Sequence, residues 1–163
     1  MWSVGEWRLD HPDLYACRSG GGGGVLGRSV PGLGHEFLLE GKDSDVRDLE
    51  AVYAGNGGCF LVAEMGGRIV GTVGVRLWSE DVAELKRLYV APAWQGRGIG
   101  EALCLRAIGE AWHLGYRALR LDTTRRAMAA LALFGRLGFR EIPRYNEDVY
   151  AEVFLERVLE GDS

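Results

Sequence analysis

Apolar and polar residues follow two different periods along the chain, and the change of period divides it into strands and helices. In its first half the apolar runs are short and rich in β-branched residues, as over 59–64, 68–76 and 82–90. Gly66 and Gly67 separate the first two runs with the spacing of a hairpin turn. The pattern therefore predicts three consecutive antiparallel strands.

In the second half, apolar residues recur at the three- and four-residue spacing of amphipathic helices, and glycines end both helical stretches. The predicted elements are a helix over 99–114, a short alternating strand over 118–123, a helix over 128–137 and a closing strand over 150–157. The order strand, helix, strand, helix predicts a parallel crossover between the strands at 82–90 and 118–123.

The beginning of the chain differs from the rest. Residues 20–24 are an uninterrupted glycine run, which is costly to order, so we predict that residues 1–34 are a flexible extension. The alternative is that the aromatic residues of this extension dock as an anchor. A first strand over 35–39 and a short helix over 43–53 would then open a single domain spanning 35–163.

Composition agrees with one globular domain. The chain has 163 residues, of which 47% are hydrophobic and 26% charged, which is enough to bury a core. Its net charge of −4 argues against nucleic acid as a partner. Residues 85–144, however, carry 11 basic and 4 acidic side chains, so an anionic ligand is expected near this segment, although most of its arginines would also serve as solvated faces.

Cysteine and histidine usage indicates neither a disulfide framework nor a metal site. The three cysteines show no C-x-x-C spacing, and the three histidines lie far apart in the sequence. No apolar stretch approaches the roughly 18 residues that a membrane-spanning helix needs. We therefore expect a cytoplasmic protein with no membrane partner and no metal.

The strongest chemical signal is the segment Gln95-Gly96-Arg97-Gly98-Ile99-Gly100, between a predicted strand and a predicted helix. Free N–H groups at a helix N-terminus, together with its dipole, form a site for phosphate or pyrophosphate. The spacing is not that of a dinucleotide fingerprint, since Glu101 stands where the third glycine belongs, and no Walker loop occurs. The alternative is a tight turn without a ligand.

This segment resembles the phosphate-binding signature [QR]-x-x-G-x-[GA] of the GCN5-related N-acetyltransferases, through Gln95, Gly98 and Gly100. The segments 84–90 and 133–139 are similar to the family's cofactor-binding strand and late helix, and the resemblance covers about residues 35–158. It implies an α/β fold with a mixed, mostly antiparallel central sheet, a splayed parallel strand pair and flanking helices.

The resemblance also implies acetyl-coenzyme A as the acyl donor. Its pyrophosphate would lie on the amides of residues 95–100, and its pantetheine would run beside the strand, where unpaired backbone groups would otherwise be penalised. The cofactor-binding residues implied in this way are Leu88, Tyr89, Val90, Gln95, Gly96, Arg97, Gly98, Ile99, Gly100 and Phe134.

Direct transfer requires a neutral acceptor amine, and from a lysine-like pKa of about 10.4 this costs about 4–5 kcal/mol at pH 7. A carboxylate can take the proton, and Glu84 is the predicted base. Its spacing from Gln95 is similar to that of the glutamate proposed as base in histone-modifying members of the family. The alternative is a salt bridge between Glu84 and Lys86 or Arg87 on an exposed strand.

Many family members carry a tyrosine in the late helix as general acid, but this chain has Phe134 there, which has no proton to donate. Solvent, Tyr89 or Tyr145 would have to serve. Tyr145 is the predicted second catalytic residue, with a half-buried core tyrosine as the alternative. Cys104 lies beside the apolar helix face and is predicted to be a small buried hydrophobe rather than a nucleophile.

The resulting prediction is an N-acetyltransferase that moves an acetyl group from acetyl-CoA to a primary amine of a small molecule or peptide by direct attack. A non-catalytic acyl-CoA-binding or sensing module is the main alternative, and a nucleic-acid binder is a weaker one. The acidic remainder of the chain hints at a cationic acceptor. Family members often pair, so a homodimer is left open.

Overall fold

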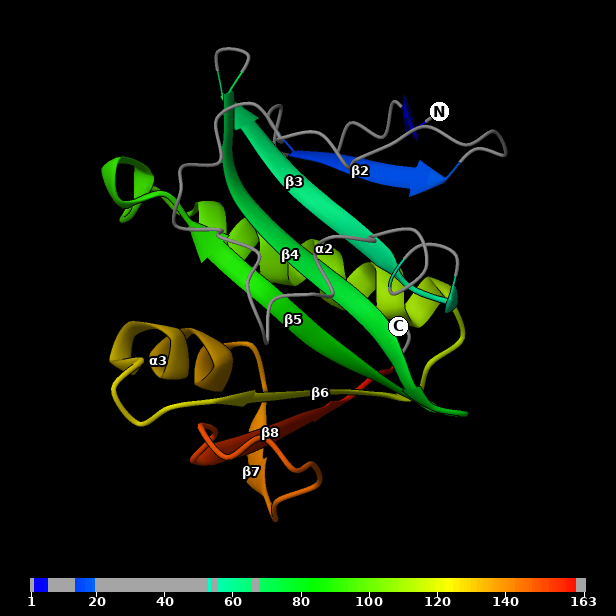
Figure 1. The fold of residues 1–163 in the computed structure, drawn as a ribbon, viewed down its shortest axis with the longest axis vertical. Coiled ribbons are helices and arrows are strands. Elements are labelled where there is room, and N and C mark those ends of the chain that lie inside the picture. Colours follow the sequence, from blue (N-terminus) through cyan, green and yellow to red (C-terminus); the bar gives the residue numbers. More distant parts are fainter. Residues whose placement is uncertain (1, 6–13, 20–52, 54–55, 66–67, 161–163) are drawn as a thin grey trace.

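The computed structural model describes residues 2–5, 14–19, 53, 56–65 and 68–160 (Figure 1). Its strands are β1 (Trp2–Gly5), β2 (Leu14–Ser19), β3 (Cys59–Met65), β4 (Arg68–Ser79), β5 (Val82–Val90), β6 (Ala118–Thr123), β7 (Arg140–Ile142) and β8 (Val153–Val158). Its helices are the 3-10 helix η4 (Pro92–Trp94), α2 (Ile99–His113) and α3 (Met128–Arg136).

The eight strands form one sheet in the order β1-β2-β3-β4-β5-β6-β8-β7. All neighbouring pairs are antiparallel except β5 and β6, which run parallel because the chain crosses over through α2 between them. The mixed, mostly antiparallel sheet with one parallel pair and flanking helices is therefore confirmed. The strand and helix bounds predicted over residues 59–137 agree with β3, β5, α2, β6 and α3 to within one residue, whereas β4 ends three residues later than predicted, at Ser79.

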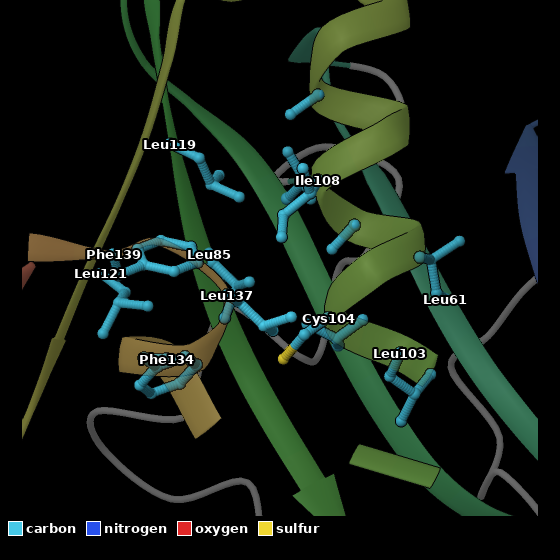
Figure 2. Close-up of a cluster of buried hydrophobic side chains, with 14 of the residues drawn as sticks. Leu61, Leu85, Leu103, Cys104, Ile108, Leu119, Leu121, Phe134, Leu137 and Phe139 are labelled. Carbon is cyan, nitrogen blue, oxygen red and sulfur yellow. The ribbon is translucent and has the colours of Figure 1, made fainter. Parts of the chain in front are cut away.

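A buried apolar layer joins the helices to one face of the sheet. Alternate residues of the central strands point into it, including Leu85 of β5 and Leu119 and Leu121 of β6 (Figure 2). Cys104 of α2 and Phe134 of α3 pack against them. This packing fixes the faces of β5 and β6, so that their intervening residues, Glu84 among them, must lie on the opposite face.

The end of the chain departs from the prediction. The last strand is β8, which lies between β6 and β7 rather than at the edge of the sheet. The edge belongs to β7, which pairs with β8 from Arg140 to Ile142. Three residues are too few for a period-two alternation to be visible in the sequence, and this strand was missed for that reason.

Two stretches of the predicted flexible extension are strands. β1 pairs with β2, and β2 pairs with β3 from Leu14 to Cys17, so these stretches extend the sheet on the side away from β6. The rest of the segment 1–34 lies outside the described residues, as do the predicted strand over 35–39 and nearly all of the predicted helix over 43–53. The domain boundary after residue 34 stays a prediction.

Within the described residues, no helix is both long and apolar enough to cross a membrane. In the same part of the chain, no three His, Cys, Asp or Glu side chains are grouped so that they could hold a metal ion.

Candidate functional site

β5 and β6 lie together at one end and then diverge toward α3 (Figure 1). They pair only from Val82 to Glu84, opposite Ala118 to Arg120. Beyond this point β5 contains a bulge against β4, where Arg87 has a φ of 58°. The Thr72 hydroxyl donates to the Arg87 carbonyl at 2.8 Å and holds the bulge from β4. The bulge redirects the strand, and β5 therefore leaves its parallel partner.

A cavity of about 380 Å³ occupies the gap between the two strands. Residues of β5, β6, α3 and the segment between β7 and β8 form its wall. Leu88 and Phe134 contribute apolar surface, whereas Lys86, Asp122 and Asp148 contribute charge. The gap is therefore a site with an apolar part and a charged part. The predicted neighbours Tyr89 and Val90 continue β5 toward α2, opposite Thr72 and Gly71 of β4.

The glycine-rich segment forms an open turn at the start of α2. Gly96 and Gly98 have φ values of 76° and 81°, a conformation that favours glycine, and a Cβ at either position would meet no atom within 4 Å. Gly98 is the N-cap residue of α2. Its carbonyl accepts the first helical bond, from the Ala102 N–H at 3.0 Å. The turn thus leaves its outer surface open.

The N–H groups of residues 96–100 donate to no other group within the described part of the chain, as expected for the first turn of a helix. The Gln95 N–H differs, because it donates to the Pro92 carbonyl at 3.3 Å. The Gln95 side chain donates to the Val90 carbonyl at 3.0 Å, which ties the turn to the end of β5. Free N–H groups on an open turn at a helix N-terminus fit a phosphate group.

Arg97 and Gly100 complete this turn. The Arg97 guanidinium lies 4.6 Å from the centre of the Trp94 ring, and its side chain is exposed. The predicted cofactor residue Ile99 is instead 4% exposed and points into the core. Only its backbone N–H is therefore available to a ligand. A Cβ at Gly100 would meet Val90 and Leu133 at ordinary contact distance, so this glycine lies beside β5 and α3.

Glu84 lies where the parallel pairing ends, and its side chain has no exposed surface. One carboxylate oxygen accepts from Arg76 Nε at 2.8 Å and Nη2 at 2.6 Å, and Lys86 Nζ lies 3.9 Å from the same oxygen. A buried carboxylate requires such a partner. The alternative considered for Glu84, a salt bridge on an exposed strand, is wrong about exposure, because the outer face of β5 is covered here. The role of Glu84 as a base stays a prediction.

Tyr145 covers the second carboxylate oxygen of Glu84. Its hydroxyl donates to Glu84 Oε2 at 2.7 Å. Its half-buried ring lies edge-on to Trp78 and Phe154, with centroids 5.1 and 5.5 Å away, and under the guanidinium of Arg120. Burial raises the pKa of Tyr145 well above its usual value, and the hydrogen bond and charge of Glu84 raise it further. At neutral pH the hydroxyl stays protonated and donating.

A second carboxylate, Asp122 of β6, lies beside Glu84 and was not predicted as a site residue. Lys86 Nζ is 3.4 Å from Asp122 Oδ1, and the Asn146 side-chain amide donates to Asp122 Oδ2. Asn146 also lies 3.5 Å from Glu84 Oε2. The sequence carried a signal for Asp122, because the polar residues that alternate with apolar ones in β5 and β6 share one face of the sheet. The position of Asn146 could not be predicted, because it lies in the long connection after β7.

The remaining predictions concern apolar positions. Cys104 has no exposed surface and belongs to the core, which confirms it as a small buried hydrophobe. Its burial raises the pKa of the thiol to about 12. Phe134 is 4% exposed, contacts Phe139 with ring centroids 5.5 Å apart and lines the cavity. In the described chain no tyrosine replaces it on the cavity wall.

The sequence of the chain is similar to those of curated N-acetyltransferases. The uncharacterized N-acetyltransferase YjgM of Escherichia coli is 33% identical over 103 residues, which are 61% of this chain and 62% of that protein. The N-acetylaspartate synthetase of Danio rerio is 40% identical over 101 residues, which are 61% of this chain and 36% of that protein. The chain thus spans less than two thirds of either curated relative.

A solved structure agrees over more of the chain. The crystal structure of a GNAT family acetyltransferase from Elizabethkingia anophelis with acetyl-CoA bound has a TM-score of 0.65 and 19% sequence identity. The match covers 91% of this chain and 100% of that one, and at this identity it shows a shared fold. The model of the acetyltransferase (GNAT) family matches residues 33–139. Since this match includes β3 to α3 and the glycine-rich turn, the chain belongs to the GNAT acetyltransferase family.

Proposed function

We propose that the chain is an N-acetyltransferase that transfers an acetyl group from acetyl-CoA to a primary amine of a small molecule or peptide. The observation that carries the proposal is the open turn over residues 96–100, whose free N–H groups lie at the start of α2, next to the end of β5. Phosphate and diphosphate groups are typical ligands of such a turn. Family membership and the acetyl-CoA bound to the Elizabethkingia protein support this choice of donor.

The chain offers a separate surface to each part of the donor. The N–H groups of residues 96–100 would hold the diphosphate, and the exposed Arg97 would add charge beside it. Leu88 and Phe134 give the cavity between β5 and β6 its apolar part, which suits the pantetheine arm. Bound there, acetyl-CoA supplies an acyl group already activated as a thioester. Gln95 would act mainly through the bond that ties the turn to Val90.

The acceptor must reach the thioester as a neutral amine. In the balanced reaction the amine nitrogen forms a bond to the carbonyl carbon, the carbon–sulfur bond breaks, and the nitrogen loses the protons that the amide does not keep. The residues predicted from the sequence to be catalytic, Glu84 and Tyr145, are joined by a 2.7 Å hydrogen bond at the inner end of the splay. Phe134 has no proton for the departing thiolate, so solvent or a tyrosine hydroxyl must supply it.

Two measurements test the proposal in sequence. Acetyl-CoA should raise the melting temperature of the protein more than adenosine nucleotides do, because a ligand of the native state stabilises it. A panel of amines that includes aspartate, a polyamine and a lysine peptide should then release free thiol. No thermal shift at saturating acetyl-CoA would contradict the proposed donor. A shift without turnover of any amine would favour an acyl-CoA-binding module.

A further inference from the structure

The cavity between β5 and β6 has two carboxylates on its wall among the described residues, and neither is that of Glu84. They belong to Asp122 of β6 and Asp148 of the segment before β8. Glu84 has no exposed surface, whereas the Asp122 side chain is 10% exposed. A group entering the cavity therefore meets Asp122 before it can reach Glu84.

The oxygens of Glu84 are occupied by donors that cannot easily leave. Arg76 approaches one oxygen through two guanidinium nitrogens, at 2.8 and 2.6 Å. The Tyr145 hydroxyl holds the other at 2.7 Å, and the Tyr145 ring is itself packed between Trp78 and Phe154. An amine could use Glu84 only by displacing these partners, which would break the ion pair of a fully buried carboxylate.

Asp148 is also occupied. One of its carboxylate oxygens accepts the Tyr150 backbone N–H at 2.9 Å, and its own backbone N–H donates to the Asn146 side chain at 3.1 Å. These bonds are those of a turn, and they hold the Asn146 amide where it reaches Asp122. Asp148 thus has a structural use that explains its presence on the wall.

Asp122 differs because its charged partner is an amine on a flexible stem. Lys86 Nζ lies 3.4 and 3.5 Å from the two oxygens, which is longer than a well-formed charged hydrogen bond. The Lys86 side chain is 20% exposed and lines the same cavity. A primary ammonium from outside has the same chemistry as this lysine head group, so it can take the same place on Asp122.

We propose that Asp122 is the carboxylate that binds the ammonium of the acceptor in place of Lys86 and accepts its proton. One N–H bond of the ammonium breaks, one O–H bond forms on Asp122, and the freed lone pair on nitrogen can form the C–N bond. Asn146 and Glu84 position Asp122 rather than react. The Asn146 amide joins the Asp122 and Glu84 carboxylates. Arg76 and Tyr145 in turn hold Glu84 in place. This inference rests on the proposed acetyltransferase function.

The charged surroundings of Asp122 define what a pH profile reports. Lys86 and Arg87 line the cavity from β5, Asp148 lines it from the segment before β8, and Glu84 faces the Asn146 amide through Oε2. Arg120 of β6 is paired with Glu156 of β8. Asparagine at position 122 cannot accept the proton, and it leaves the other charged groups of the cavity in place. The variant therefore acts only on substrate amine that is already neutral in solution.

The test compares Asp122→Asn with Glu84→Gln and with Glu156→Gln, a strand carboxylate paired with an arginine outside this cavity. With an amine that the wild type acetylates, Asp122→Asn should lower kcat/KM at pH 7 about 10²–10⁴-fold, as expected for loss of a general base. Its activity should rise with pH as the amine becomes neutral and approach that of the wild type. Its acetyl-CoA thermal shift should be unchanged, and Asp122→Glu should retain more activity.

Glu156→Gln should keep the wild-type profile, and Glu84→Gln should lose activity without the recovery at high pH. Wild-type activity in Asp122→Asn at pH 7, or recovery in Glu84→Gln alone, would overturn the inference and leave the proposed function intact. Lack of turnover by the wild type with every amine would instead contradict the proposed function and the inference with it. If Asp122→Asn fails to fold, Lys86→Met decides, because loss of the competing amine should lower the acceptor KM, and an unchanged or raised KM would overturn the inference.

Discussion

The pKa of the Cys104 thiol depends strongly on the burial of this side chain. It has no exposed surface, and desolvation, with a smaller contribution from Glu101, raises its pKa from 9.0 to about 12. Between these values the unfolded chain loses a proton that the native protein keeps. The contribution to stability is therefore full below pH 9 and is lost as the pH rises toward 12.

The expected result is a steeper fall of the free energy of unfolding above pH 9 for the wild type than for Cys104→Ala, by up to about 1.4 kcal/mol per pH unit. Urea unfolding of both proteins at pH 8, 9 and 10 measures the difference. Parallel curves for the two proteins would show that the thiol does not titrate differently in the native and unfolded states.

Thr72 is the residue that supports the divergence of β5 from β6. Its side chain is fully buried, and its hydroxyl holds the Arg87 carbonyl at the bulge. Thr72→Val keeps the shape but removes the donor, so it should lower the free energy of unfolding by about 1–3 kcal/mol. Since the bulge directs β5 away from β6, acetyl-CoA should also bind more weakly. Unfolding and titration experiments that detect no change in either quantity would exclude this role of Thr72.

At the scale of elements, the turn into α2 has a matched counterpart at its other end. Gly98 and Gly115 have φ values of 81° and 93°, and a Cβ at either would meet open space. Alanine at either position should therefore cost a similar backbone strain of about 1–2 kcal/mol. Only Gly98→Ala alters the proposed diphosphate site, so it alone should raise the Kd for acetyl-CoA, severalfold or more. Calorimetric titration of both variants measures this, and equal Kd values would contradict the assignment.

The sequence was most informative where a period persists over several residues. The alternation in β5 and the helical spacing in α2 predicted both elements within a residue of their observed bounds. β7 was missed because three residues carry no period, and Asn146 because a loop gives no clue to where it returns. Arg76 was missed for another reason, since the ion pairs considered for Glu84 were those with Lys86 or Arg87 on an exposed strand. A buried carboxylate changes which cation must reach it.

At the scale of the whole molecule, β1 and β2 form one edge of the sheet. Ala16 of β2 lies opposite Leu61 of β3 and Gly5 of β1, so proline at this position would remove a ladder hydrogen bond. Ala16→Pro should lower the free energy of unfolding by about 1–3 kcal/mol. A flexible extension over residues 1–34 would tolerate the substitution, and an unchanged melting temperature would therefore favour that earlier prediction.

The basic segment 85–144 also has to be judged in the whole fold. Arg106 and Arg125 pair with Glu110 and Glu141 of the same segment, whereas Arg120 pairs with Glu156 outside it. Glu156 therefore balances part of the local excess of positive charge. Arg97, at the glycine-rich turn, lies exposed on Trp94 instead. Positive charge thus remains where the proposed donor carries its phosphates.

The binding of the diphosphate by main-chain nitrogens at the start of α2 is the central claim, and amide chemical shifts report on it directly. In a titration of the ¹⁵N-labelled protein with acetyl-CoA, the amide resonances of Gly96, Gly98 and Gly100 should show large shifts, whereas that of Gly115 should stay in place. Saturating binding that leaves the three glycine amides unmoved would contradict the account.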